Sequence, residues 1–160
     1  MQTAGTRDGK QLTDKGMEDD FVYSAIKIAK YVINKCTVDC HPISNLQLQK
    51  ILYYIQRSFL RTGTIAFSDE IEAWQFGPVV REVYNKYCGF GSLKICMNYD
   101  ETIRDDYANI IDRIVEKKRL LNSWDMVDDT HSPGKAWNLI YRDGIGDHQV
   151  IPKELIRTKG

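Results

Sequence analysis

Apolar residues recur every three or four positions in two stretches of the N-terminal half, which is the spacing of amphipathic helices. The first stretch starts at Asp20 and has Lys27, Lys30 and Asn34 on its polar face. Its apolar positions are Val22, Ala25, Ile26, Ala29, Val32, Ile33 and Cys36. This spacing predicts one helix that packs along a single face.

The second stretch runs from Ser44 to Gly63, and Ser44 and Gln47 have the spacing of a capping box just after Pro42. Its predicted core face consists of Leu48, Ile51, Leu52, Ile55 and Phe59. Because Leu46, Tyr53 and Tyr54 add apolar surface away from that face, we expect this helix to be covered on more than one side and to be central to the fold.

The periodicity changes between Gly63 and Pro78, where single polar residues separate the apolar ones. We expect a short strand or extended segment at residues 70–75. Gly77 permits a turn that other residues resist, and Pro78 suits the first position of a helix. The helix predicted from Val79 to about Tyr87 would bury Val80, Val83, Tyr84 and Tyr87.

Three further helical patterns follow a short apolar run at Leu93 to Met97. A long helix is expected over about 101–122, with Ile111 and Leu121 among the residues of its inner face, acidic residues near its start and basic residues near its end. Ser123 is expected to cap a short helix that carries Trp124 and Val127, and Ser132-Pro133 to open another that carries Ala136, Trp137, Ile140 and Tyr141. Pro152 starts a terminal helix.

These patterns predict a mainly α fold: a single compact helical domain of about six helices, with a short β or extended segment around residues 65–75. Residues 1–16 have almost no large apolar side chain and no periodicity. We interpret them as a flexible tail, either a vector-derived leader or a natural extension, and assign residues 17–160 to the domain.

Composition narrows the class of protein. The chain has 160 residues, of which 42% are hydrophobic, enough for a real core. Lys plus Arg and Asp plus Glu number 22 each, so no net field attracts a polyanion and nucleic acid is an unlikely partner. No apolar run approaches the roughly 20 residues of a membrane span. We expect a cytoplasmic protein without a membrane partner.

Candidate catalytic and metal-binding residues are few. Cys36, Cys40 and His41 form the best potential zinc cluster, but Cys88 and Cys96 lack the spacing of a second ligand pair. We therefore expect buried free thiols, no cofactor and no metal. The carboxylates Asp125, Asp128 and Asp129 read as the solvated face of a helix. Thr130 would bond back to a carbonyl, and His131 would donate or accept a hydrogen bond with the neighbouring turn.

Tryptophan is the residue type that points most directly to an interface. Trp74 adjoins Phe76-Gly77-Pro78, so this corner is either packed or an exposed docking ledge. We favour packing for Trp74 and Trp137, with the partner site on the surface beside them.

Three ordered segments together resemble the Panacea domain, also called the SocA-like or phage-associated GepA-like family: LQLQKILYYIQ at 46–56, EAWQFGPVVREVYNKY at 72–87 and TH-x5-W at 130–137. The positions that match are Leu48, Gln49, Lys50, Leu52, Tyr53, Tyr54, Glu72, Trp74, Gly77, Pro78, Val79, Tyr84, Thr130, His131 and Trp137. One departure is that Ala136, where the family pattern has proline, precedes Trp137.

The resemblance implies a bacterial or prophage protein without enzymatic activity, an antitoxin that neutralises a cognate toxin by direct contact. It also implies an adaptor role in one founding type, which delivers its toxin to a AAA+ protease. The partner surface would lie near the Trp74–Pro78 corner and the 130–137 segment. We assign as partner-binding or motif residues Gln49, Lys50, Tyr53, Tyr54, Trp74, Phe76, Gly77, Pro78, Val79, Tyr84, Thr130, His131 and Trp137.

Two other functions remain open from the residues alone. A metal- or thiol-dependent hydrolase would need a cysteine, His131 and the carboxylates of 125–129 to converge. A DNA-binding autoregulator would need a basic outer helix face, for which Arg57 and Arg61 are a start.

Overall fold

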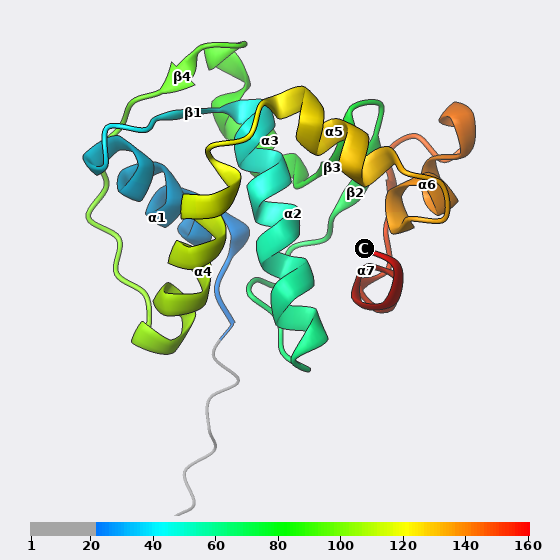
Figure 1. Ribbon diagram of the computed structural model, residues 1–160, viewed down its shortest axis with the longest axis horizontal. Helices are drawn as coiled ribbons and strands as arrows, with labels where there is room; N and C mark the ends of the chain where they lie inside the picture. Colours follow the sequence, from blue (N-terminus) through cyan, green and yellow to red (C-terminus); the bar gives the residue numbers. More distant parts are fainter. Residues whose placement is uncertain (1–21) are drawn as a thin grey trace, which may run out of the picture.

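The computed structural model describes residues 22–160, so the predicted tail at 1–16 lies outside the described residues. Within this range the chain is mainly α, as predicted, and Figure 1 shows its helices arranged around α2. The helices are α1 (Ala25–Val38), α2 (Asn45–Arg61), α3 (Arg81–Tyr87), α4 (Asp105–Lys118), α5 (Ser123–His131), α6 (Ala136–Tyr141) and α7 (Lys153–Lys159). Short 3-10 turns follow α3 and α6, at Cys88–Phe90 and Arg142–Gly144 respectively.

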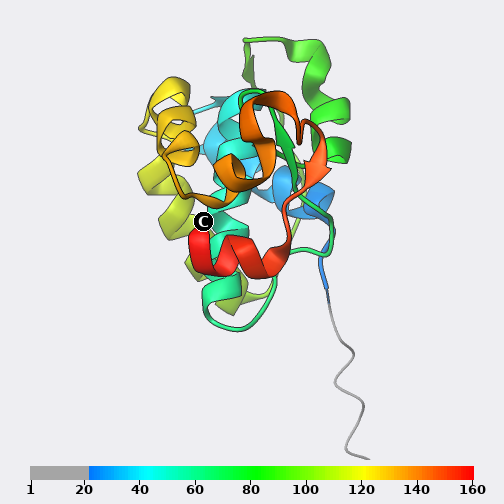
Figure 2. The same cartoon turned by 90° about the vertical axis from the view of Figure 1, so that its right-hand side faces the viewer.

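Helix α2 is the centre of the fold. Ser44 accepts a hydrogen bond from the Gln47 backbone while the Gln47 side chain accepts one from the Ser44 backbone, which confirms the predicted capping box. The predicted core face is fully buried, and Tyr53 and Tyr54 are buried as well. Helices α1, α3, α4, α5 and α7 all contact α2. Figure 2 shows α7 beside its C-terminal half. A helix covered on nearly every side explains its apolar surface beyond one stripe.

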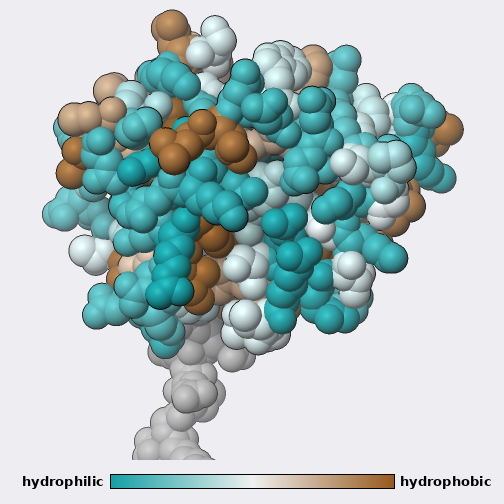
Figure 3. Space-filling model, in the orientation of Figure 1, coloured by the Kyte–Doolittle hydropathy of each residue, from teal (hydrophilic) through white to brown (hydrophobic). Residues whose placement is uncertain are grey.

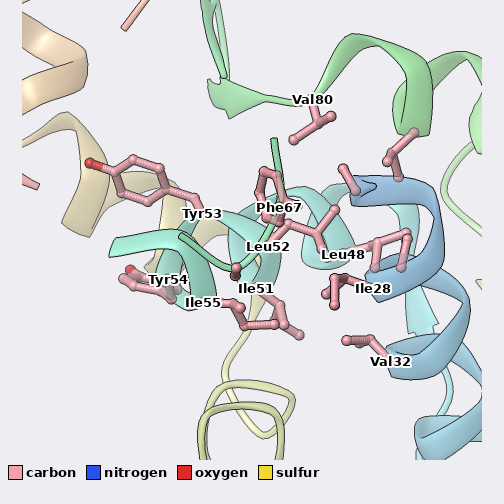
Figure 4. Close-up of a cluster of buried hydrophobic side chains, with 14 of the residues drawn as sticks. Ile28, Val32, Leu48, Ile51, Leu52, Tyr53, Tyr54, Ile55, Phe67 and Val80 are labelled. Carbon is pink, nitrogen blue, oxygen red and sulfur yellow. The ribbon is translucent and has the colours of Figure 1, made fainter. Parts of the chain in front are cut away.

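The main cluster of core side chains joins α1 to α2. Figure 4 shows Ile28 and Val32 of α1 near Leu48 and Ile51 of α2, with Phe67 and Val80 closing the cluster. Each such side chain, once buried, contributes about 1.5–3 kcal/mol of transfer free energy.

Helix α1 begins later than predicted. Ser24 is its N-cap and accepts a hydrogen bond from the backbone N–H of Lys27, and Asp69 accepts one from the N–H of Ala25. These two side chains satisfy donors at the start of the helix, so it begins at Ala25. Val22, which the periodicity placed in the core, is exposed.

The extended segment is confirmed as β2 (Glu72–Trp74), the central strand of a small antiparallel sheet with the order β3-β2-β5. Strand β3 is Gly77–Val79 and β5 is Gln149–Val150. A second sheet pairs β1 (Ile43–Ser44) with β4 (Lys94–Ile95), so the apolar run at 93–97 contains a strand.

The predicted role of Pro78 is wrong. Pro78 lies in β3 opposite Ala73, and α3 begins only at Arg81. Pairing with β2 and a hydrogen bond from the Val80 N–H to a side chain of α2 keep this backbone extended. Tyr84, predicted to be buried, is exposed on α3.

Helix α4 is shorter than the predicted helix. Residues 101–104 precede the helix without regular secondary structure, and the N–H of Arg104 donates to the Tyr23 hydroxyl at 2.9 Å. At the other end Leu121, assigned to the inner face, is exposed. Val115 is buried instead, one turn after Ile111.

Two predicted helix starts are also corrected. Asn122, and not Ser123, caps α5, through a hydrogen bond from the N–H of Trp124 to the Asn122 side chain. Ser132 and Pro133 lie in a turn, and α6 begins at Ala136. The Gly134 φ of +79° redirects the chain between these two points.

All four cysteines are free, but only Cys36 is buried, so the prediction of buried thiols is wrong for Cys40, Cys88 and Cys96. Across residues 22–160, the structure contains no helix with the length and apolar character needed to cross a membrane.

Candidate functional site

Buried polar side chains of α2 hold the corner between β2 and β3. The Gln49 amide oxygen accepts from the Val80 N–H at 3.0 Å, and its amide nitrogen donates to Asn45 at 3.0 Å. The Lys50 ammonium donates to the carbonyl oxygen of Pro78 at 3.2 Å. All three α2 side chains are buried. Their hydrogen bonds are strengthened by exclusion of water and fix the corner on α2.

Gly77 lies directly over the end of Lys50. Its φ is +113°, and a Cβ at this position would be 2.6 Å from Lys50 Nζ and 3.1 Å from Thr130 Oγ1. The turn predicted at Gly77 is therefore present, and close packing excludes any side chain there. Burial lowers the pKa of Lys50 to about 7, because the charged ammonium is disfavoured away from water.

Thr130 and His131 lie behind the same corner. Thr130 Oγ1 donates to the Val127 carbonyl at 3.0 Å, which confirms its predicted backward hydrogen bond. The predicted hydrogen bond of His131 is wrong: its ring stacks on Trp137 at 3.5 Å, and its buried Nε2 has no partner within residues 22–160. Burial, followed by the charge of Lys50, lowers the pKa of His131.

Trp137 joins α6 to the sheet. It is buried, as predicted, and its indole N–H donates to the carbonyl oxygen of Trp74 at 2.8 Å. Its second face is covered by Tyr141, with the ring centroids 4.5 Å apart. His131, Trp137 and Tyr141 thus form a stack that supports the corner from behind.

Trp74 is only half-buried and presents its ring to the surface. The ring stacks with His148 at 4.2 Å and contacts Tyr84 at 4.8 Å. Glu72 accepts two hydrogen bonds from Arg81, at 2.8 and 2.7 Å, and one from the Trp74 indole at 3.4 Å. The Arg81 guanidinium, the largest influence, lowers the pKa of Glu72. These contacts fix the orientation of Trp74.

A concave surface of about 560 Å³ opens in front of the corner, and we call it the aromatic groove. Its floor is formed by α2 and the corner, and exposed aromatic side chains of Phe76, Tyr84 and Trp124 stand along it. Phe76 and Trp124 meet edge to face at 5.6 Å while remaining 48% and 55% exposed. The lining residues are Asn45, Leu46, Gln49, Lys50, Trp74, Gln75, Phe76, Val79, Tyr84, Cys88, Gly91, Ser92, Trp124, Asp147 and His148.

The structure divides the predicted site residues into three groups. Those that line the aromatic groove are Gln49, Lys50, Trp74, Phe76, Val79 and Tyr84. Those that support it from beneath or behind are Gly77, Pro78, Thr130, His131 and Trp137. Tyr53 and Tyr54 lie outside this groove, farther along α2, where the Tyr54 hydroxyl donates to Asp129 at 2.5 Å.

Sequence reasoning did not include Trp124, Asn45 or His148 in the site. The sequence did hold a signal for Trp124, because a large aromatic residue stands beside acidic residues on a predicted short helix. Such a position favours an exposed aromatic side chain. The roles of Asn45 and His148 depend on contacts between distant segments and had no local signal.

Within the described residues, no group of three or more His, Cys, Asp or Glu side chains is placed to hold a metal ion. Cys88 and Cys96 are on the surface, and His131 is stacked on Trp137.

By its fold and its site, the protein is a small, mainly α-helical domain. Its central helix supports a tryptophan-containing β corner and an exposed aromatic groove. The family follows from comparison with known proteins. The model of the family "Antitoxin SocA-like, Panacea domain" matches residues 48–138, from the first turn of α2 into α6. The chain belongs to this family, which confirms the resemblance seen in the sequence.

The chain is also similar to the antitoxin SocA of Caulobacter vibrioides (strain NA1000 / CB15N). The two are 27% identical over 140 residues, which cover 77% of this chain and 73% of that protein. No solved structure matches the chain.

Proposed function

We propose that this protein neutralises a cognate toxin by binding it directly, with the aromatic groove as the contact surface. Membership of an antitoxin family supports a toxin as the partner. We choose the aromatic groove as the contact surface because the exposed side chains of Phe76 and Trp124 lie beside its apolar concavity. Contiguous exposed aromatic surface is characteristic of protein interfaces, where Trp and Tyr side chains contribute most of the binding energy.

The support beneath the groove favours a preorganised interface. Gln49 and Lys50 fix the corner from within, and Trp137 fixes the backbone of Trp74 from behind. Side chains that are already ordered lose little conformational entropy when a partner binds. The partner segment would place apolar side chains in the groove, against the Phe76 and Trp124 rings.

The test is co-expression with candidate toxins, beginning with the product of the adjacent gene, followed by co-purification on a sizing column. We expect the wild-type chain to restore growth and to elute with the toxin. The double variant Phe76→Ala/Trp124→Ala should lose both properties while keeping its melting temperature, because both side chains are exposed. A loss of about 2 kcal/mol or more, over twentyfold in Kd, is typical of interface aromatics.

Val38→Ala is the matched control, since Val38 is an exposed apolar residue at the end of α1, outside the groove. It should bind and rescue as the wild type does. Full binding by the Phe76/Trp124 variant would exclude the groove as the contact surface, and absence of a complex with every toxin that the chain neutralises would exclude direct contact.

An adaptor role for a AAA+ protease is a further part of the proposal, suggested by the resemblance. The toxin and the protease would both be located in the cytoplasm, together with this chain. The two modes differ in one measurement: with simple masking, the toxin level stays constant during rescue, whereas with an adaptor it falls and recovers when the protease is inactivated.

A further inference from the structure

A second concave surface lies between the C-terminal halves of α2 and α4, at the other end of α2 from the aromatic groove. It encloses about 470 Å³, and we call it the basic cavity. Figure 1 shows the two helices side by side, and Figure 3 shows mainly hydrophilic residues over them in the same view. The residues that line it are Tyr54, Arg57, Ser58, Arg61, Thr62, Arg113, Ile114, Lys117 and Lys118. Five of these are basic and none is acidic.

The positive charges of the basic cavity are not balanced by ion pairs. Among residues 22–160, none of its five basic side chains forms a salt bridge, although other lysines and arginines of the chain do. Arg61 donates to the backbone oxygen of Gly160 at 3.2 Å. Asp129, at the edge of the cavity, accepts the hydrogen bond of Tyr54. Since the chain as a whole has equal numbers of basic and acidic residues, this is a local concentration of charge.

Tyr54 brings two of the cations together. The Lys118 ammonium lies 4.1 Å and the Arg57 guanidinium 4.8 Å from the centre of its ring. Burial first, and then the charges of Arg57, Lys117 and Lys135, lower the pKa of Lys118 despite the opposing effect of Asp129. The cations of the two helices therefore repel one another, and a bound anion would relieve that repulsion.

Helix dipoles account for only part of this arrangement. Arg61, Lys117 and Lys118 lie in the last turns of α2 and α4, where a positive charge stabilises the helix. Arg57 and Arg113 precede those turns, so the dipole gives no reason for them to face the same cavity.

We infer that the basic cavity binds a compact polyphosphate group, two or three condensed phosphates as in a nucleoside di- or triphosphate. Arg57 and Arg61 are one helical turn apart on α2, as are Arg113 and Lys117 on α4, a span of about 6 Å along each helix. That span suits a short anion of high charge density better than an extended strand. Arginine binds phosphate oxygens with two parallel hydrogen bonds, and the Ser58 hydroxyl supplies a further donor.

An extended polyanion fits these observations less well. A nucleic acid or an acidic peptide would carry its charges beyond the two helical turns that the cavity provides, and a chain with no net charge has no long-range field to attract it. The inference goes beyond the proposed toxin binding and does not depend on it, because the aromatic groove and the basic cavity share no lining residue.

The test is calorimetric titration of the full chain with inorganic tripolyphosphate at low salt. We expect one site and an affinity that falls as salt is raised. The double variant Arg113→Gln/Lys117→Gln should bind at least about tenfold more weakly, since two charge-assisted contacts are lost. Both side chains are exposed and form no hydrogen bond or ion pair within residues 22–160, so the melting temperature without ligand should not change.

Lys86→Gln is the matched control, because Lys86 is also an exposed lysine in the last turn of a helix. It should leave the affinity unchanged. The inference is overturned if tripolyphosphate does not bind, if Lys86→Gln weakens binding as much as the double variant does, or if a single-stranded oligonucleotide or an acidic peptide of equal charge binds more tightly. Toxin neutralisation by the double variant should be intact in every case, which separates this result from the test of the groove.

Discussion

The indole N–H of Trp137 donates to the carbonyl oxygen of Trp74 at 2.8 Å, so one tryptophan of the sequence pattern fixes the backbone of the other. This hydrogen bond joins α6 to β2 and places the Trp74 ring at the aromatic groove. Trp137→Phe removes the donor and keeps a ring that can stack on His131. We expect a loss of about 1–3 kcal/mol in the free energy of unfolding, because the partly buried carbonyl of Trp74 loses this donor.

Urea denaturation would measure this loss. Trp124→Phe is the matched control, since Trp124 is 55% exposed and its side chain supports no buried hydrogen bond in the described structure; it should change the stability by less than about 0.5 kcal/mol. Equal effects of the two substitutions would contradict the assigned role of the Trp137 hydrogen bond.

Gly77→Ala should destabilise the protein by about 2–4 kcal/mol. The backbone has a positive φ of +113°, and the added Cβ would lie 2.6 Å from Lys50 Nζ, so strain and overlap act together. Thermal denaturation measures the effect. Gly89→Ala is the control, because that position has no positive φ and no atom within 4 Å of a Cβ; a melting temperature of Gly77→Ala equal to that of Gly89→Ala would refute the prediction.

The burial of Lys50 should make stability depend on pH. Its pKa is about 7 in the folded chain and 10.5 as the ordinary value, so between these pH values the unfolded state binds more protons. The free energy of unfolding therefore rises with pH through this window, by at most about 1.4 kcal/mol per pH unit from this group, and the gain is lost as pH falls to 7.

Lys50→Met removes this titration. The difference in stability between wild type and variant, measured by urea denaturation from pH 6.5 to 9.5, should shift in favour of the wild type as pH rises. Lys86→Met, at an exposed lysine, should give a difference that is flat with pH. A flat difference for Lys50→Met would mean that Lys50 titrates normally in the folded protein.

Gln56 should be one of the most sensitive polar positions. It is fully buried, its amide oxygen accepts from the N–H of Ala66 at 2.8 Å, and its amide nitrogen donates to the carbonyl of Phe67 at 2.8 Å. Gln56→Leu leaves these backbone groups without partners, and we expect a loss of about 2–5 kcal/mol.

Hydrogen exchange provides a second measurement for Gln56→Leu, because the amide of Ala66 should lose its protection. Gln149→Leu, at an exposed position of β5, is the control for adding an apolar side chain. Retained protection at Ala66 would show that another group replaces the glutamine.

The local sequence predicted the parts of the fold that depend on neighbouring residues. The Ser44–Gln47 capping box, the buried face of α2 and the extended residues 72–74 are each determined within a few positions of the chain. The turn at Gly77 was likewise predicted, because only glycine adopts its backbone conformation without strain.

Positions that depend on contacts between distant segments could not be predicted in this way. Pro78 is a good first residue of a helix, but pairing with β2 and hydrogen bonds to α2 make it part of a strand. A hydrogen bond to the neighbouring turn was predicted for His131, but the His131 ring stacks on Trp137 instead. In both cases the tertiary contacts contribute more free energy than the local conformational preference, so the contacts decide the structure.

The sequence by itself determined the helical class, the central position of α2 and the family, because amphipathic periodicity and the ordered segments are properties of the chain. Only the tertiary structure decided that Phe76 meets Trp124, that Lys50 lies under Gly77, and that the cations of α2 and α4 face one cavity. The physical reason is that a surface site is formed by side chains from separate elements, and their relative positions are fixed only when the core between those elements packs.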